Sequence, residues 1–221
     1  FALCGKNFFT IYTLGMNNSF DLRTHKRNQG ATNIRFHPHE SNTLISIQTS
    51  FPSNIFIMDI EQNPNTQKKI GCHQRVITGI SWNEHNNDLL ATCSQDQSIK
   101  VWDRKITMPI KEKKSPDPII NIEIKERLRD CQFSPFYEYY LLSSGDNGSI
   151  YLFDIRKYNT NVTNCSSQNI NIENLKDYSF AQQRKVVQSL CWHPTKRNIF
   201  CSGDMDQFIP IWDINEFSQI K

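Results

Sequence analysis

Long apolar runs are missing from this sequence of 221 residues. No uninterrupted apolar stretch approaches the length of about eighteen residues that a membrane-spanning helix needs. The chain starts at Phe1, and no charged segment followed by an apolar one resembles a secretory leader. We therefore expect a protein that is neither secreted nor inserted into a membrane.

An excess of charge of one sign is also missing. The 25 Lys and Arg residues against 22 Asp and Glu residues give a net charge of +3, which is too small to argue for binding to nucleic acid or to an acidic membrane. The basic cluster at 111–114 is short and is interpreted as solvated loop charge. The length is sufficient for one domain with a sizeable core.

The seven cysteines form no disulfide framework. Four of them lie inside apolar runs, where a free thiol packs as a small hydrophobic side chain: Cys93, Cys131, Cys191 and Cys201. This usage favours a reducing compartment. We expect a cytoplasmic protein, and leave open an association with the lysosome or vacuole, or with the nucleus.

Sequence motifs of catalysis and of metal binding are absent as well. There is no GxGxxG, P-loop or GxSxG sequence. Cys72-His73 lacks the CxxC or HxxxH spacing that completes a zinc site, and the imidazoles of His37 and His39 lie in an expected turn. We predict no catalytic residue, no metal, no cofactor and no small-molecule substrate, and therefore a protein that is not an enzyme.

What the sequence does contain is a repeated pattern of short strands, clearest between His73 and Asp103. Three apolar runs are separated there by the polar segments 83–88 and 95–97. Breaks of this length join antiparallel neighbours and are too short for a helical crossover. The segment therefore predicts three consecutive antiparallel strands.

Two markers recur four times along the chain. The first expected strand of each repeat ends at an aromatic residue, at Phe36, Trp82, Phe133 and Trp192, and the third ends at an aspartate, at Asp59, Asp103, Asp154 and Asp213. The distance from aromatic residue to aspartate is the same in three of the four repeats, whereas the distance between repeats grows. Such a pattern indicates a rigid unit with expandable connections.

The repeat that ends in Trp102-Asp103 and has His73 upstream resembles a WD (WD40) repeat, the four-stranded blade of a β-propeller. The resemblance implies a hydrogen-bonded chain formed by His73, Thr92, Asp96 and Trp102. Leaving one buried member of the chain without a partner would cost about 1–3 kcal/mol. A second, partial chain is implied at Ser202, Asp206 and Trp212, with Gln183 in place of the histidine.

The predicted fold is all-β: a WD40 β-propeller segment, residues 1–221, with four full blades after a partial one. The expected divisions are 1–26 for the partial blade, then 27–70, 71–114, 115–157, and 158–221 for an insertion loop with the last blade. Four blades are fewer than the seven usual in the family, so we expect part of a longer seven-bladed ring, or closure by a partner's strands. A closed four-bladed ring is the less favoured alternative.

Three features between and within the repeats carry their own expectations. Residues 111–125 contain two prolines and are interpreted as a surface excursion. Residues 158–174 are rich in Asn, Ser and Thr and are interpreted as a mobile loop. Pro210 falls inside the expected strand 208–214, which is unusual because proline donates no ladder hydrogen bond.

Three basic residues are candidates for an interaction surface. Arg75 and Lys185 precede inner strands and would take acidic residues of a protein partner, with solvated surface charge as the alternative. Phe153-Asp154-Ile155-Arg156 resembles the WDxR sequence with which cullin-ring ligase substrate receptors bind their adaptor, with Phe in place of Trp.

A narrower resemblance concerns the segments 4–12, 129–134 and 148–156, which are similar to propeller subunits of the SEA (GATOR-type) complex. That family implies a role in amino-acid signalling to TOR. We therefore expect a non-enzymatic scaffold that binds other proteins in a multisubunit complex, with a ubiquitin-ligase substrate receptor as the alternative.

Overall fold

A computed structural model describes residues 2–5, 8–14, 20–27, 31–48, 50–61, 67–106, 108–109, 115–158, 179–182, 185–205, 209–215 and 218–220. The chain separates into two compact units, which are considered one at a time. The first comprises residues 1–76 and 104–116, and the second comprises residues 77–103 and 117–221. The prediction of a single propeller segment stays a prediction.

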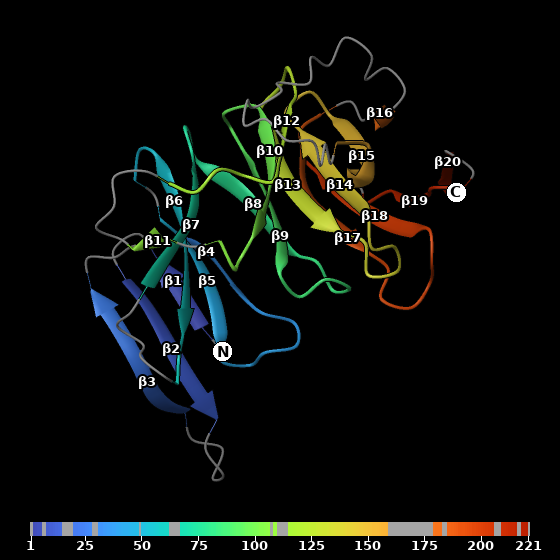
Figure 1. Ribbon diagram of the computed structural model, residues 1–221. Helices are drawn as coiled ribbons and strands as arrows, with labels where there is room; N and C mark the ends of the chain where they lie inside the picture. The colour runs from blue at the N-terminus through green and yellow to red at the C-terminus, as the bar shows by residue number, and fades with distance from the viewer. Residues whose placement is uncertain are drawn as a thin grey trace. The chain divides into compact units, whose positions relative to one another are not determined.

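The first unit contains two antiparallel sheets (Figure 1). The three-stranded sheet has the order β1 (Ala2–Gly5), β2 (Phe8–Leu14) and β3 (Phe20–Arg27), in the part of the chain where a partial blade is expected. The second sheet has the order β11-β7-β6-β5-β4. Its strands are β4 (Ala31–Phe36), β5 (Thr43–Gln48), β6 (Ser53–Asp59), β7 (Gln67–His73) and the short β11 (Met108–Pro109).

The second unit contains three four-stranded sheets. The first has β8 (Ile77–Trp82), β9 (Leu89–Ser94), β10 (Ser98–Asp103) and β12 (Ile120–Glu123). The second has β13 (Leu128–Phe133), β14 (Tyr140–Gly145), β15 (Ser149–Asp154) and β16 (Ser179–Gln182), with the 3₁₀ helix η1 (Ile155–Tyr158) after β15. The third has β17 (Val187–Trp192), β18 (Ile199–Asp204), β19 (Ile211–Asp213) and β20 (Ser218–Ile220).

The first three strands of each of these sheets form an antiparallel meander with short connections. Between β14 and β15, Gly148 adopts a φ of 83° and its N–H donates to the carbonyl of Gly145 at 3.2 Å. Glycine meets no steric penalty at positive φ, so the Asp-Asn-Gly sequence forms a hairpin turn. The all-β expectation and the four recurrent sheets are confirmed.

The expectation for residues 111–125 was wrong in the part of that segment that the structure describes. Residues 120–123 form β12, the outer strand of the β8–β9–β10 sheet, with Ile122 opposite Ile99. The apolar side chains of Ile120, Ile122 and Ile124 are buried. The alternating isoleucines pack against a core. The two prolines upstream of them had favoured a surface excursion in the sequence-based prediction.

Two further expectations concern the last repeats. Strand β19 begins at Ile211, so Pro210 lies just outside it, and its carbonyl accepts the N–H of Ser202 at 3.2 Å. The expected strand was therefore too long at its start, since proline donates no hydrogen bond to a ladder. Of the segment 158–174, only Tyr158 is described; it is buried at the end of η1, and the remainder lies outside the described residues.

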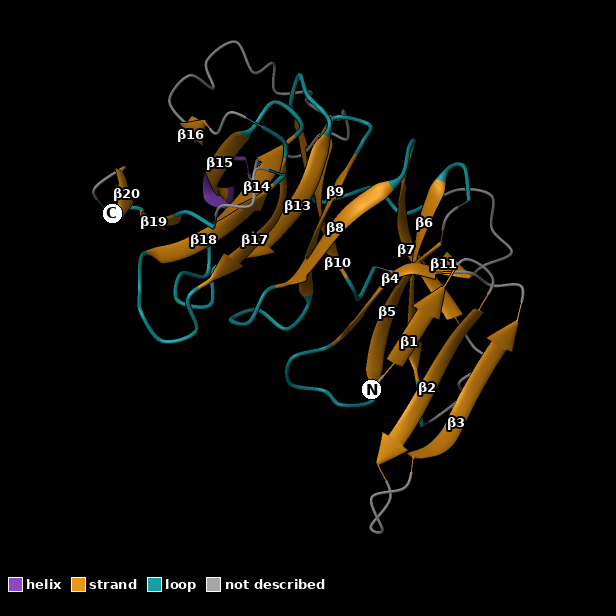
Figure 2. Cartoon of the chain, turned by 180° about the vertical axis from the view of Figure 1, so that it is seen from behind, coloured by secondary structure: helices purple, strands orange, loops and turns teal. Residues whose placement is uncertain are grey.

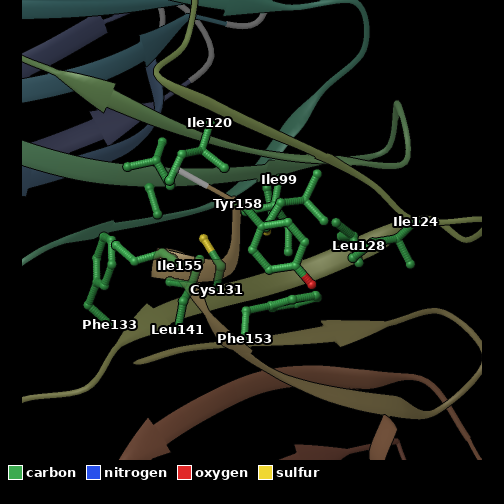
Figure 3. Close-up of a cluster of buried hydrophobic side chains, with 14 residues drawn as sticks. Ile99, Ile120, Ile124, Leu128, Cys131, Phe133, Leu141, Phe153, Ile155 and Tyr158 are labelled. Atoms are coloured by element: carbon green, nitrogen blue, oxygen red, sulfur yellow. The ribbon is translucent and has the colours of Figure 1, made fainter. Parts of the chain in front are cut away.

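The core of the second unit lies between consecutive sheets. Strands β8, β13 and β17 lie side by side in Figure 2, as their contacts show. Fourteen buried side chains fill the space between the β8–β12 and β13–β16 sheets (Figure 3). Phe153 packs edge-on against Tyr158 there, with ring centroids 6.1 Å apart. Because the sheets pack on one another through such clusters, the ends of their strands are held in place. The candidate interaction residues of this unit lie at strand ends.

Candidate functional site

Two buried indole hydrogen bonds lie where the polar chains are predicted. The Nε1–H of Trp102 donates to Oγ1 of Thr92 at 2.8 Å, and that of Trp212 donates to Oγ of Ser202 at 2.9 Å. Each bond joins neighbouring strands of one sheet. The equivalent geometry in the two sheets shows that these residues hold positions of the same kind. Asp206 and Gln183 lie outside the described residues.

Asp96 is fixed in the turn between β9 and β10. Its Oδ1 accepts the N–H of Ser98 at 3.1 Å and the hydroxyl of Ser98 at 2.6 Å, while its own N–H donates to Oγ of Ser94 at 3.0 Å. His73 is fully buried at the end of β7, in the first unit. The contact expected between His73 and Asp96 stays a prediction.

The third repeat replaces the chain with a different buried network. Phe153 offers no N–H, and the hydroxyl of Ser143 donates instead to the carbonyl of Asp130 at 3.0 Å. The buried carboxylate of Glu126 accepts the N–H of Asn147 at 2.9 Å and the hydroxyl of Tyr151. Burial and the hydrogen bond to Glu126 raise the pKa of Tyr151 to about 12.

Sequence reasoning missed Glu126. The available signal was an acidic residue between two apolar ones, Ile124 and Leu128, at alternate positions before a predicted inner strand. All three side chains are buried, although residues 124–127 lie in the connection between β12 and β13 and not in a strand. A carboxylate in that pattern indicates a bonded interior group.

The recurrent aspartates end strands, as predicted. Oδ1 of Asp59 accepts the N–H of Glu61 at 2.9 Å, and Oδ1 of Asp213 accepts the N–H of Asn215 at 2.8 Å. Each carboxylate thus caps the turn that leaves the third strand. This turn bond gives the recurrent aspartate a structural role at the end of the third strand.

A second cap follows the first strand of every full repeat. Nδ1 of His37 accepts the N–H groups of residues 39 and 40, and Nδ1 of His193 accepts those of residues 195 and 196. Oδ1 of Asn83 accepts the N–H groups of residues 85 and 86, and Oγ of Ser134 accepts those of residues 136 and 137. The structural role predicted for the His37 turn is confirmed.

The basic candidates lie at strand ends. Arg75 and Lys185 are exposed. Lys185 precedes β17, whereas Arg156 follows β15, so the two lie at opposite ends of the strands in the second unit. The structure therefore does not bring Lys185 and Arg156 together.

Arg156 is held on the surface by its own strand end. Its guanidinium donates from Nε to Oδ1 of Asp154 at 2.9 Å and lies over the ring of Tyr139, 4.9 Å from the centroid. The hydrogen bonds from Arg156 lower the pKa of Asp154, and those to Asp154 raise the pKa of Arg156. The side chain of Arg156 is nevertheless 59% exposed, so its outer donors stay accessible.

Among the described residues, no three His, Cys, Asp or Glu side chains are grouped so that they could hold a metal ion. Within the same residues, no helix is both long and apolar enough to cross a membrane.

Comparison with known families now decides the identity of the repeats. The family model described as "WD domain, G-beta repeat" matches residues 64–103 and 176–213. The chain contains WD repeats. The two matched segments include both tryptophans whose indoles bond across their sheets, and the repeats in which sequence reasoning placed the polar chains.

Curated relatives of this WD-repeat chain are distant. "Histone acetyltransferase type B subunit 2" of Candida glabrata is 24% identical over 190 residues, which cover 83% of this chain and 38% of that protein. "GATOR2 complex protein WDR24" of Danio rerio is 22% identical over 220 residues, 97% of this chain and 25% of that protein. The chain thus spans less than half of either relative, and its resemblance to a GATOR-type propeller subunit is confirmed.

Solved structures confirm the β-propeller fold. "COPII on membranes, outer coat vertex" matches with a TM-score of 0.70 and 18% identity, over 99% of this chain and 56% of the other. "Crystal Structure of Mitotic Checkpoint Complex" matches with a TM-score of 0.70 and 15% identity, over 100% of this chain and 61% of the other. At these identities the similarity concerns the fold alone.

Proposed function

We propose that the chain acts as a non-enzymatic scaffold that assembles a multisubunit protein complex through the ends of its blades. The observation that carries this proposal is that the polar side chains fall into a buried, bonded group and an exposed, basic group. The recurrent ones are bonded inside blades, as in the Thr92–Trp102 pair, whereas Lys185 and Arg156 reach solvent at strand ends. Exposed cationic groups on a rigid frame suit acidic segments of a protein partner.

The comparisons support a role in an assembly. Among the relatives, one is named as a subunit of a histone acetyltransferase and another as a protein of the GATOR2 complex. We extend the second similarity to propose a place in nutrient signalling to TOR, in the cytoplasm and in association with the lysosome or vacuole. Partners are other proteins; nucleic acid, membrane insertion and a small-molecule substrate have no part in the proposal.

The test is affinity purification of the full-length protein, with mass spectrometry of the proteins that accompany it. Lys185→Glu and Arg156→Glu reverse charge at opposite strand ends, and Glu123→Lys on the outer strand β12 is the matched control. We expect one of the two end variants to lose a stable partner that the control retains. Recovery of no stable partner by the unmodified protein would contradict the proposal.

A second candidate function is that of a substrate receptor of a cullin-ring ubiquitin ligase, and it rests on Arg156. Its bidentate pairing with Asp154 and its contact with Tyr139 hold the guanidinium in one orientation at the blade end. This candidate requires the ligase adaptor to co-purify with the unmodified protein and to be lost from Arg156→Ala. An Arg156→Ala variant that retains the adaptor removes this function.

A further inference from the structure

The β13–β16 sheet is covered on both of its faces. Leu141 lies in the cluster shared with the β8–β12 sheet, and the adjacent Leu142 lies in the cluster shared with the β17–β20 sheet. This sheet therefore meets solvent at its outer edge and at the ends of its strands. At the end where β13 and β15 finish, it presents the turn 134–139 and the helix η1.

An exposed tyrosine distinguishes this end of the sheet. Among the aromatic side chains of the second unit whose burial the structure describes, only that of Tyr139 is exposed. The opposite end presents the exposed cations Lys125 and Arg127 without an exposed aromatic side chain in its described residues. Tyrosine and arginine are over-represented among the residues that dominate binding at protein interfaces. The composition therefore favours the end that contains Tyr139.

The turn that contains Tyr139 is bonded to both neighbouring sheets. Nδ2 of Asn83, which follows β8, donates to the carbonyl of Glu138 at 2.8 Å. On the other side, the hydroxyl of Tyr137 donates to Oδ1 of Asn198, which precedes β18, at 2.7 Å. A surface that is fixed before binding loses little conformational entropy when a partner binds.

The same turn orients the guanidinium of Arg156. The N–H of Ile155 donates to the carbonyl of Tyr139 at 2.9 Å, which places η1 beside the turn. Asp154 occupies the Nε and Nη2 side of the guanidinium, and the ring of Tyr139 lies against its face. The N–H groups of Nη1 lie on the side away from Asp154. A planar guanidinium held in this way suits a second carboxylate.

The charges around Tyr139 favour an acidic occupant. Arg156 and Lys157 are both exposed. Of the carboxylates beside them, that of Asp154 is paired with Arg156, and that of Glu138 accepts the tyrosine hydroxyl. Glu84 is exposed, but it lies on the turn after β8 in the neighbouring sheet. A carboxylate of a partner is therefore attracted to the η1 side of this end.

We propose that Tyr139 and Arg156 anchor an interaction surface that binds a segment of a protein partner in which a carboxylate side chain stands next to an apolar one. The carboxylate accepts the outer N–H groups of Arg156, and the apolar side chain packs on the exposed part of the Tyr139 ring. This inference rests on the proposed scaffold function. It adds which end of the second unit binds and the chemistry of what that end binds.

The test begins with photo-crosslinking in the complex of the full-length protein, with p-benzoylphenylalanine in place of Tyr139. The same crosslinker in place of Arg127, at the opposite end of the sheet, is the control. We expect position 139 to crosslink more strongly than position 127 to a peptide of a co-purified subunit, and that peptide to contain Asp or Glu beside an apolar residue. A crosslinked peptide without an acidic residue, or equal crosslinking from both positions, would overturn the inference.

The crosslinked peptide is then synthesised, and fluorescence anisotropy measures its affinity for the full-length protein. Tyr139→Ala and Arg156→Ala should each weaken binding at least about tenfold. Tyr139→Phe keeps the ring, so it should stay within about threefold of the unmodified protein, as should Arg127→Ala. Replacement of the acidic residue of the peptide by its amide should weaken binding as Arg156→Ala does. Unchanged affinity in either alanine variant at the proposed anchor would count against the inference.

Failure of the inference and failure of the scaffold function give different results. If the full-length protein retains stable partners and none of them crosslinks to position 139, the inference is wrong and the scaffold function stands. If the full-length protein retains no stable partner, the scaffold function fails, and with it the inference that rests on it.

Discussion

At the scale of single residues, buried polar groups in this chain are matched to specific partners. The indoles of Trp102 and Trp212 each find a hydroxyl on the neighbouring strand, one from threonine and one from serine. The interchange of Thr92 and Ser202 indicates that the hydroxyl matters and the methyl group does not. A donor buried without an acceptor costs about 1–3 kcal/mol.

Thr92→Val should therefore destabilise the protein by about 1–3 kcal/mol, because the variant keeps the shape and removes the acceptor of the Trp102 indole. Urea unfolding followed by tryptophan fluorescence measures the change. Thr92→Ser is the matched control and should stay within about 1 kcal/mol of the unmodified protein. Equal midpoints for the valine and serine variants would contradict this account.

Glu40 provides a pH-dependent prediction. Hydrogen bonds from Arg104 and then from Thr43 lower its pKa from 4.5 to about 2. A depressed folded-state pKa adds stability above pH 4.5 and loses it as the pH falls from 4.5 to about 2. Because the Glu40 side chain is 42% exposed, the contribution should be about 1 kcal/mol or less.

The measurement is an NMR titration of the Glu40 carboxyl carbon in the folded protein. In Arg104→Gln the midpoint should rise from about 2 back toward 4.5, since the largest cause of the shift is removed. An unchanged midpoint in this variant would show that Arg104 does not hold the carboxylate in its ionised form.

At the scale of elements, the first strand of each full repeat ends at a side chain that bonds the backbone of the next turn. His37, Asn83, Ser134 and His193 end the first strand of the four full repeats in one geometry with three different acceptor types. Because the turns are defined in this way, the strands pair in fixed register, and their inner strands can approach closely. One such close approach involves Gly79, in β8.

Gly79→Ala should destabilise the protein by about 1–3 kcal/mol or more, since an added Cβ would lie 2.7 Å from the backbone nitrogen of Cys131 in the adjacent sheet. Gly203→Ala is the matched control, because its Cβ would meet only the side chain of Ser189, at 3.0 Å. Thermal unfolding should show the larger loss for Gly79→Ala. Equal losses would mean that the two inner strands can separate without cost.

At the scale of the whole molecule, sheets of the second unit are joined by polar contacts as well as by apolar clusters. Oδ2 of Asp130 in β13 accepts the N–H of Leu190 in β17 at 2.9 Å. The N–H of Phe133 donates to Oγ of Ser81 at 3.0 Å. In repeat architectures such nearest-neighbour contacts add to the stability of each unit.

Removal of the Asp130 carboxylate should loosen the last sheet more than the first. In Asp130→Ala we expect faster hydrogen exchange in residues 187–204, with β8 and β9 changed less, because only the former sheet loses its bonded neighbour. Asp130→Asn keeps an acceptor oxygen and is the control. Uniform acceleration across all three sheets would show that the unit opens as a whole and would contradict this assignment.

The local pattern was sufficient for the strands and their turns. Short apolar runs, polar breaks and the two recurrent markers predicted β8, β9 and β10, and the Thr92–Trp102 pair was implied by the resemblance to a WD repeat. The same rules placed Pro210 inside a strand, whereas β19 begins at Ile211. They also predicted a surface excursion at residues 111–125, because proline was given more weight than the alternating isoleucines of β12. Hydrophobic periodicity depends on residues close together in the sequence. It therefore predicts a strand and its turn, but not which other segments pack against that strand.

The sequence by itself determined the repeated antiparallel unit, since strand pairing between neighbours depends on residues a few positions apart. Only the tertiary structure decided which side chains meet between sheets. The carboxylate of Glu126 accepts the hydroxyl of Tyr151, Oδ2 of Asp130 accepts the N–H of Leu190, and Cys131 is fully buried between two sheets. Those outcomes depend on the packing of segments distant in the chain, because burial and bonding partners are properties of the folded surroundings.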